Sequence, residues 1–71
     1  MSTRTNFVRA MRADEAVQAY IARTATDLDD CLCDFLCDLM HWSDKCEFDF
    51  AAALDRASGH YAAERTEERA L

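Results

Sequence analysis

Proline is absent from this chain of 71 residues, and Gly59 is its only glycine. Proline and glycine mark turns, loops and strand ends, so their scarcity leaves little room for these features. Residues that favour helices, such as alanine, leucine, glutamate and arginine, are abundant instead. The composition therefore predicts an all-α protein that is helical along most of its length.

The chain also has no long apolar run. No stretch approaches the ~20 apolar residues that span a bilayer, so we expect no contact with membranes. The N-terminal residues, Met1 to Arg9, lack the apolar segment of a secretion signal, and we therefore expect a cytoplasmic protein. In the cytoplasm its four cysteines would stay reduced and form no disulfide framework.

Basic residues are few and unevenly placed. The net charge is −6; residues 27–55 hold nine acids against the single Lys45, whereas residues 1–26 hold four arginines against two acids. Phosphates repel an acidic surface, so we expect no direct binding to nucleic acid. A protein partner with a basic surface fits this charge distribution better.

The polarity of the chain divides it into an arm and a domain. Residues 1–12 are polar and contain several arginines, which predicts a flexible N-terminal arm. Residues 13–71 are predicted to form a single helical domain. Its second helix is expected over about 50–68, with Asp49 as the N-cap residue.

The first helix of this domain is predicted from apolar spacing. Four apolar residues recur at intervals of seven: Ile21, Leu28, Phe35 and Trp42. This spacing places them on one face, and we predict one continuous helix over about 14–43. The alternative is a kink or short break near 24–26, where Thr26 could cap a new helix.

The link between the two predicted helices is short, which favours an antiparallel helical hairpin. Neither helix can bury its apolar stripe alone, so the two stripes together are predicted to form the core: Ile21, Leu28, Leu32, Phe35, Leu39, Trp42, Phe50, Leu54 and Tyr61. A core of this size gives marginal stability. Self-association into a homodimeric bundle would add to it.

The long helix has apolar side chains on more of its circumference than one neighbour can cover. At ~100° per residue, a second group extends beyond the predicted core stripe: Cys33, Leu36, Cys37 and Met40. Exposed apolar faces bordered by charge usually mark interaction sites. We predict that this face binds either a second copy of the chain or another protein.

Aspartates form a second pattern on the same helix. Four of them follow at intervals of three or four residues: Asp27, Asp30, Asp34 and Asp38. Aspartate is a weak helix former and like charges one turn apart repel, so glutamate would serve solubility better. We therefore predict that this ridge contacts a basic partner, with simple solvation as the alternative interpretation.

Cysteine and histidine supply only weak candidates for chemistry. Cys37, His41 and Cys46 are of the ligand types that Zn²⁺ selects, but the chain has no Cys-x-x-Cys motif and a fourth ligand would be needed. Packing as small apolar side chains is the simpler role for the cysteines. A Cys-His nucleophile would stand on an exposed helical face without a pocket. We expect no cofactor and no enzymatic activity; a thiol-metal protein is a remote alternative.

The stretch from Asp38 to Glu64 carries a pattern of its own, D-L-x-H-W-x-D followed by D-F, A-L and H-Y-x-x-E. The residues that match it are Asp38, Leu39, His41, Trp42, Asp44, Asp49, Phe50, Ala53, Leu54, His60, Tyr61 and Glu64. In this pattern the chain resembles small uncharacterised proteins encoded by bacteriophages and mobile elements. Those proteins have glycine where this chain has Glu47. The resemblance implies a helical hairpin of mobile-element origin in a bacterial host, and it implies no activity.

Together these observations predict a small acidic interaction protein that acts without catalysis. Its apolar face, flanked by aspartates, would bind a protein partner or a second copy. Small acidic phage proteins often inhibit host defences. The alternative is therefore an inhibitor of the anti-CRISPR or anti-restriction type, which would mimic the charge of nucleic acid.

Overall fold

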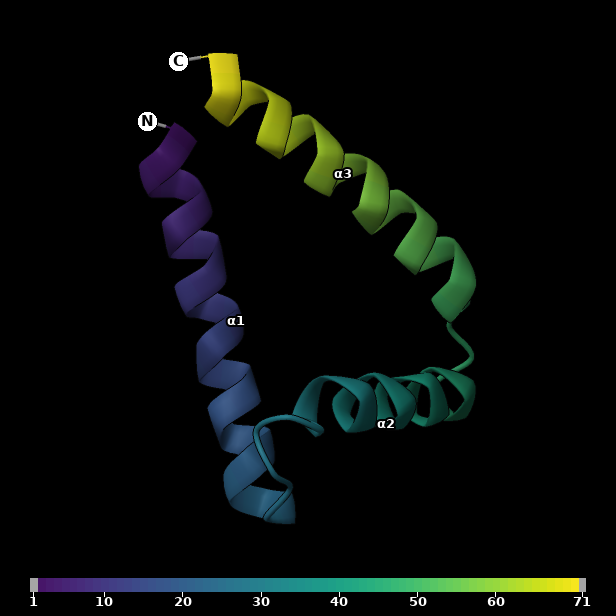
Figure 1. Ribbon diagram of the computed structural model, residues 1–71. Coiled ribbons are helices and arrows are strands. Elements are labelled where there is room, and N and C mark those ends of the chain that lie inside the picture. The colour runs from purple at the N-terminus through teal and green to yellow at the C-terminus, as the bar shows by residue number, and fades with distance from the viewer. Residues whose placement is uncertain (1, 71) are drawn as a thin grey trace.

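The computed structural model describes residues 2–70 of the chain, with side chains described from residue 5 to residue 69. Three helices make up the described part: α1 (Ser2–Thr24), α2 (Cys31–Lys45) and α3 (Phe50–Ala70). Short connections join them, and no strand occurs among these residues (Figure 1). The predicted all-α class is therefore confirmed. The two-helix hairpin is not, because the structure has a third helix.

The predicted long helix over 14–43 is wrong, because the chain breaks after Thr24. Ala25 adopts the left-handed conformation with φ 57°, and its N–H donates to the carbonyl of Ile21 over 2.7 Å. The hydroxyls of Thr24 and Thr26 lie 2.8 Å apart, a side-chain hydrogen bond that competes with helix continuation. The aspartates that follow are weak helix formers. The alternative of a break near 24–26 is the arrangement observed.

The N-terminal segment also differs from its prediction. The sequence predicts a flexible arm over 1–12, but residues 2–12 form the first half of α1; residue 1 lies outside the described residues. Asn6 and Arg9 dock on α3, where the Asn6 amide donates to the carbonyl of Glu64 over 3.3 Å. The Arg9 guanidinium lies 3.5 Å from the Glu64 carboxylate. These contacts join the N-terminal half of α1 to α3.

The connection between α2 and α3 is a Schellman motif. The N–H of Phe48 donates to the carbonyl of Ser43 over 2.8 Å, and that of Glu47 to Asp44 over 3.2 Å. This pattern requires the left-handed conformation at Glu47, whose φ is 61°. The apolar contact that accompanies such motifs is formed by Phe48 and Trp42, with ring centroids 5.5 Å apart.

The start of α3 follows the sequence prediction. Asp49 precedes the first residue of the helix, and its Oδ1 accepts a hydrogen bond from the N–H of Ala52 over 3.0 Å. This bond satisfies one of the backbone donors that a helix N-terminus leaves free. The prediction of Asp49 as the N-cap is thereby confirmed.

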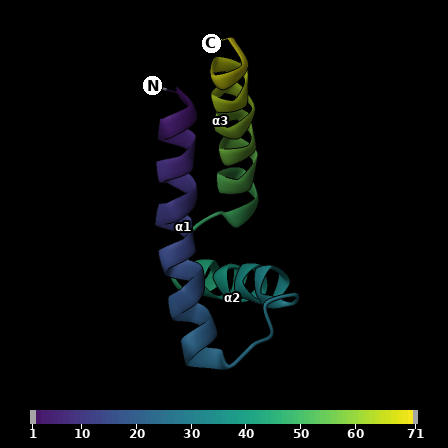
Figure 2. The same ribbon diagram turned by 60° about the vertical axis from the view of Figure 1, so that its left-hand side comes forward.

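The three helices enclose an open triangle. In Figure 1, α1 and α3 approach one another near the chain ends, and α2 crosses between their other ends. Figure 2, turned by 60°, shows α1 and α3 running in opposite directions, with α2 lying across them. Each pair of helices therefore meets over a short length.

This architecture leaves almost no core. Among the described residues only Cys31 and Ser43 are buried, at 6% and 5% exposure. Of the predicted core residues, Ile21, Phe35, Leu39 and Phe50 are only half-buried. The others are more than half exposed: Leu28, Leu32, Trp42, Leu54 and Tyr61. The predicted core is therefore not closed by the described residues, because α2 turns across the end of α1 and none of the three described helices lies over its outward side.

The overall dimensions lead to the same conclusion. The chain exposes 6059 Å², whereas a compact monomer of 8.1 kDa would expose about 4,500 Å². Its radius of gyration is 14.2 Å, against about 11 Å for a compact domain of this length. About 1,500 Å² of surface is thus available beyond what a closed fold would leave.

The two left-handed residues give a direct test of the connections. A residue with a Cβ costs about 1 kcal/mol in this conformation, and glycine avoids most of that cost. We expect Glu47→Gly and Ala25→Gly each to raise the free energy of unfolding by about 0.5–1 kcal/mol. Thermal denaturation followed by circular dichroism at fixed protein concentration measures the change.

The matched control is Ala57→Gly, which makes the same substitution as Ala25→Gly inside α3. There the glycine should destabilise by about 1 kcal/mol. If Ala25→Gly destabilised as much as Ala57→Gly, the left-handed turn after α1 would be disproved.

Candidate protein-interaction surface

The outward side of α2 carries an apolar strip. Leu32, Leu36 and Met40 follow one another at intervals of four residues, and their exposed fractions are 66%, 39% and 51%. Cys33 and Cys37, which lie next to them around the helix, are exposed free thiols. We refer to these five residues as the α2 face. Together with Asp29 they line a shallow groove of about 530 Å³.

The structure brings together the residues that the sequence assigns to this face, and their role in binding stays a prediction. The four residues assigned to a binding face line one groove: Cys33, Leu36, Cys37 and Met40. Leu32, which the sequence assigns to the core, joins them instead. The side of α2 that packs inward contains Cys31 and Phe35. Leu32 follows Cys31 at about 100° around the helix and is therefore left in solvent.

Three exposed carboxylates border the α2 face: Asp29, Asp30 and Asp34. Asp29 lines the groove itself, and Asp34 lies in the first turn of α2. Asp30 occupies the N-cap position, but its side chain makes no capping hydrogen bond. Within the described part of the chain, none of these three carboxylates forms an ion pair with a basic residue. We refer to them as the acidic border.

The predicted aspartate ridge is not continuous. Asp27 lies in the connection before α2, where its carbonyl accepts the N–H of Asp30 over 3.0 Å. Asp38 is turned toward α1 and accepts a hydrogen bond from the hydroxyl of Tyr20 over 2.7 Å. Of the four predicted members, only Asp30 and Asp34 therefore share the flank next to the α2 face. The break after Thr24 is the cause, since it removes Asp27 from the helix.

Tyr20 is the residue that sets the orientation of α2. Its ring stacks on that of Phe35 with centroids 4.6 Å apart and planes inclined by 17°. The hydrogen bond to Asp38 raises the pKa of Tyr20 to about 12, with smaller contributions from desolvation and from the negative charges of Asp38 and Asp34. Sequence reasoning missed this residue. The signal for it is its helical spacing from Val17 and Thr24, which places it on the inward side of α1.

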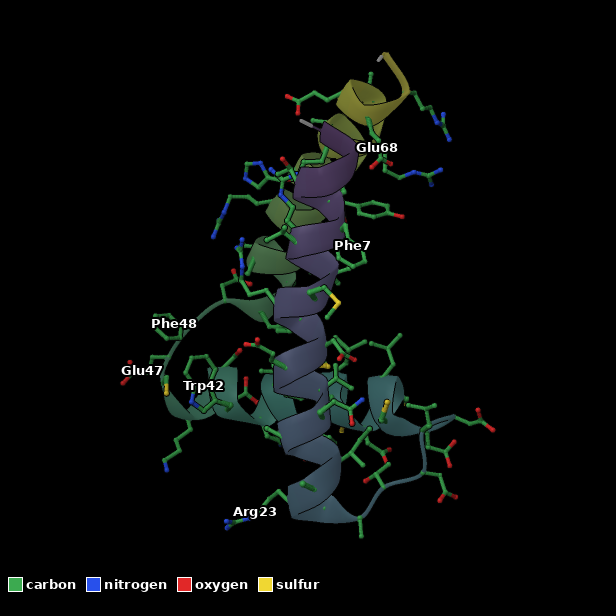
Figure 3. The ribbon with its side chains drawn as sticks, turned by 90° about the vertical axis from the view of Figure 1, so that its left-hand side faces the viewer. Phe7, Arg23, Trp42, Glu47, Phe48 and Glu68 are labelled. Atoms are coloured by element: carbon green, nitrogen blue, oxygen red, sulfur yellow. The ribbon has the colours of Figure 1, made fainter. Side chains whose placement is uncertain are left out.

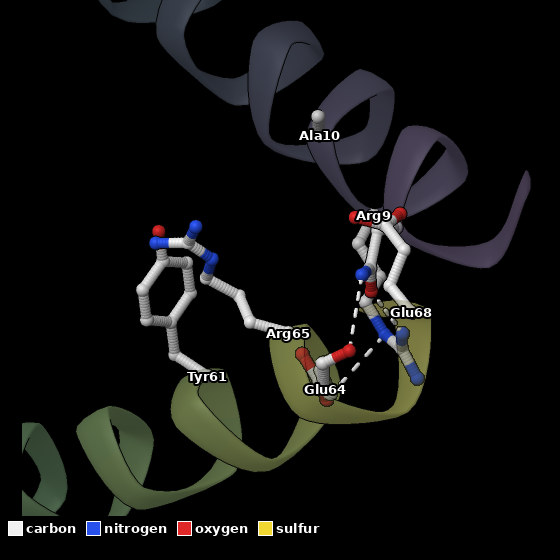
Figure 4. A pocket seen from close by; sticks show the side chains of 7 residues that line it. Arg9, Ala10, Tyr61, Glu64, Arg65 and Glu68 are labelled. Carbon is white, nitrogen blue, oxygen red and sulfur yellow. Dashed lines mark hydrogen bonds and ion pairs between the residues drawn. The ribbon is translucent and has the colours of Figure 1, made fainter. Parts of the chain in front are cut away.

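A second groove, of about 380 Å³, lies between α1 and α3. Figure 4 shows Arg9 from α1 and Glu64 from α3 approaching one another across it, with Tyr61 and Arg65 further along α3. The Arg65 guanidinium lies 5.9 Å from the centre of the Tyr61 ring. Two arginines and two glutamates line this groove, so its charges cancel and favour no charged ligand. The residues that line it join α1 to α3 through the contacts of Asn6 and Arg9 with Glu64.

The thiol and imidazole side chains do not assemble into a site. Within the described part of the chain, no group of three or more His, Cys, Asp or Glu side chains is placed to hold a metal ion. The weak metal candidates Cys37, His41 and Cys46 are thus not brought together. None of the described helices combines the length and apolar character needed to cross a membrane.

These observations define an all-helical protein with an uncovered apolar face beside an uncompensated acidic border. Comparison with known proteins adds no relative to this description. No family model, curated protein or solved structure matches the chain.

The contact between Tyr20 and Asp38 is testable by titration. In a Tyr61→Phe background Tyr20 is the only tyrosine, and its phenol should ionise with a midpoint of about 12 in ultraviolet absorbance. Asp38→Asn removes the carboxylate that stabilises the neutral phenol, so the midpoint should fall toward 10.

The same shift has a consequence for stability. Because the pKa of Tyr20 is raised in the folded state, its hydrogen bond to Asp38 stabilises the fold fully below pH 10. This stabilisation is lost as the pH rises through 12. The Asp38→Asn variant should therefore lose less stability than its parent between these values. A parent midpoint near 10 would rule out the hydrogen bond.

Proposed function

We propose that this chain is a small, acidic, non-enzymatic protein-interaction module that binds its partner through the α2 face. The partner that fits is a protein surface with an apolar strip bordered by arginine or lysine. One observation carries the proposal: Leu32, Leu36 and Met40 are exposed next to the acidic border. The carboxylates of this border form no ion pair with a basic residue within the described part of the chain.

The apolar side chains supply most of the expected affinity. Full burial of a leucine or methionine side chain is worth about 1.5–3 kcal/mol, and three of them lie in a row on α2. Methionine and the two cysteines are soft, adaptable side chains that tolerate imperfect packing. The acidic border contributes in a different way. It speeds association and orients the partner, and salt weakens its effect.

The acidic border, together with Asp27 in the connection before α2, also supports a second candidate function, the mimicry of nucleic-acid charge. Asp27, Asp29 and Asp30 lie within four consecutive residues, and Asp34 follows one turn later. Such a cluster can occupy a basic site that otherwise holds phosphates. A protein of this kind would act as an inhibitor of a nucleic-acid-binding complex, of the anti-CRISPR or anti-restriction type. The two candidates differ in what carries the affinity, because charge mimicry depends on the carboxylates and not on Leu36.

A peptide of known design tests the leading proposal. The probe is an amphipathic helical peptide with leucines along one face and lysines on both flanks. We expect it to bind the wild-type chain, and Leu36→Asp to weaken binding at least about tenfold through lost apolar burial. Fluorescence anisotropy of the labelled peptide gives the dissociation constant.

The role of the border is read from the salt dependence. The triple change of Asp29, Asp30 and Asp34 to Asn should weaken binding at low salt and have little effect at about 0.5 M salt, where exposed charges are screened. The matched control neutralises three exposed acids elsewhere: Asp44, Asp55 and Glu67. Equal affinity of the wild type and Leu36→Asp for the peptide would refute the proposal. Binding lost with the triple variant but kept with Leu36→Asp would favour charge mimicry.

A further inference from the structure

A second apolar patch lies on α1, far along the chain from the α2 face. Phe7, Val8 and Met11 are exposed by 64%, 48% and 48%. Phe7 and Met11 are separated by one helical turn, and Val8 is adjacent, so the three share one side of α1. We refer to them as the α1 patch. Arg12, which is also exposed, directly follows it in the sequence.

We propose that the α2 face is covered by the α1 patch of a second copy of this chain, and that the contact is reciprocal. The product is a twofold homodimer in which each copy contributes both surfaces. The inference rests on the proposed function, because it names the occupant of the same α2 face.

The exposed area fits two such contacts. One chain exposes about 1,500 Å² more than a compact protein of its mass. A standard interface takes about 800 Å² from each partner. The surplus of one chain is therefore large enough for the α2 face and the α1 patch together to be buried in one dimer interface. The surface left exposed would then be no smaller than that of a compact protein of this mass.

Charge decides between a reciprocal dimer and one in which two α2 faces meet. Residues 1–26 carry a balance of +2, and residues 27–55 carry −8. Packing α2 on its symmetry mate would bring two acidic borders together, and like charges at an interface disfavour it. In the reciprocal contact Arg12 of one copy approaches the acidic border of the other, so opposite charges meet on both sides of the twofold axis.

The positions of the two surfaces suit this symmetry. The molecule is 39 Å long; the α1 patch lies in the N-terminal half of α1, and α2 crosses the C-terminal end of that helix. Figure 3 shows Phe7 on the side of α1 toward which the connection between α1 and α2 also bends. Two copies laid side by side in opposite directions would bring each patch to the partner's α2. Both surfaces present rows with a spacing of four residues, which interlock at an axis angle of about −50°.

Substitutions that reverse the charge on the α1 patch side or on the acidic border test the contact. Sedimentation equilibrium of the full chain should show a dimer for the wild type. Arg12→Glu and Asp34→Arg should each weaken dimerisation at least about tenfold, because each variant places like charges at both copies of the contact. An equimolar mixture of the two variants should dimerise again, since each contact of the mixed dimer then pairs one acidic side chain with one basic side chain.

Controls separate this effect from misfolding. Arg23→Glu makes the same change on α1 as Arg12→Glu, but Arg23 points away from the side that bears Phe7 (Figure 3). Asp55→Arg is the matched control for Asp34→Arg, on exposed α3 surface. Neither control should weaken the dimer. The double variant Arg12→Glu with Asp34→Arg in one chain should restore the homodimer, which shows that both substitutions are tolerated by the fold.

Two results would overturn the inference. A strict monomer at millimolar concentration that still binds the leucine-lysine peptide would leave the proposed function standing and exclude the second copy as the occupant. Dimerisation unaffected by Arg12→Glu, with Asp34→Arg pairing best with the wild type, would show that two α2 faces meet instead. Rescue in the mixture of Arg12→Glu and Asp34→Arg supports the reciprocal contact.

Discussion

Tyr20 holds α2 across the end of α1 through two contacts at once. Its ring stacks on Phe35, and its hydroxyl donates to Asp38. A stacked pair and a hydrogen bond to a carboxylate fix both the distance and the rotation of α2. Because Phe35 and Asp38 face α1, the side of α2 that bears Leu32, Leu36 and Met40 faces outward. The α2 face is therefore exposed because the contacts of Tyr20 with Phe35 and Asp38 turn the other side of α2 toward α1.

The remaining contacts between helices are too modest to close the molecule. The Arg9–Glu64 pair that joins α1 to α3 is partly exposed, with about a third of each side chain in solvent. Ion pairs of this kind contribute at most about 1 kcal/mol. With only Cys31 and Ser43 buried among the described residues, most of the apolar surface that would stabilise an ordinary domain stays exposed, and the proposed partner would cover part of it. Binding would then stabilise the fold as well as carry the function.

Some of the structure was accessible from local sequence signals. The scarcity of glycine and proline predicts helix, and Asp49 before an apolar stripe predicts the start of α3, where its side chain caps the helix. Leu36 and Met40 were assigned to an exposed face from their helical angle, and they are exposed. Each of these inferences depends on residues within a few turns of one another, which is the range over which capping and periodicity act.

The errors had two sources, a local interruption that the apolar spacing does not register and contacts between residues far apart in the sequence. The spacing of Ile21 and Leu28 is compatible with one helix, but it does not register the left-handed conformation of Ala25. The polar stretch 2–12 is helical in the structure, where Asn6 and Arg9 contact Glu64, more than fifty residues away.

The sequence by itself determined the helical class, the cap of α3, the separation of charge and the amphipathic character of α2, because these are properties of neighbouring residues. Only the tertiary structure decided that α2 lies across α1, that Leu28 and Leu32 are exposed and that Asp38 is engaged by Tyr20. Those outcomes depend on which face of α2 packs against α1. The break between Thr24 and Cys31 redirects the side chains that follow it.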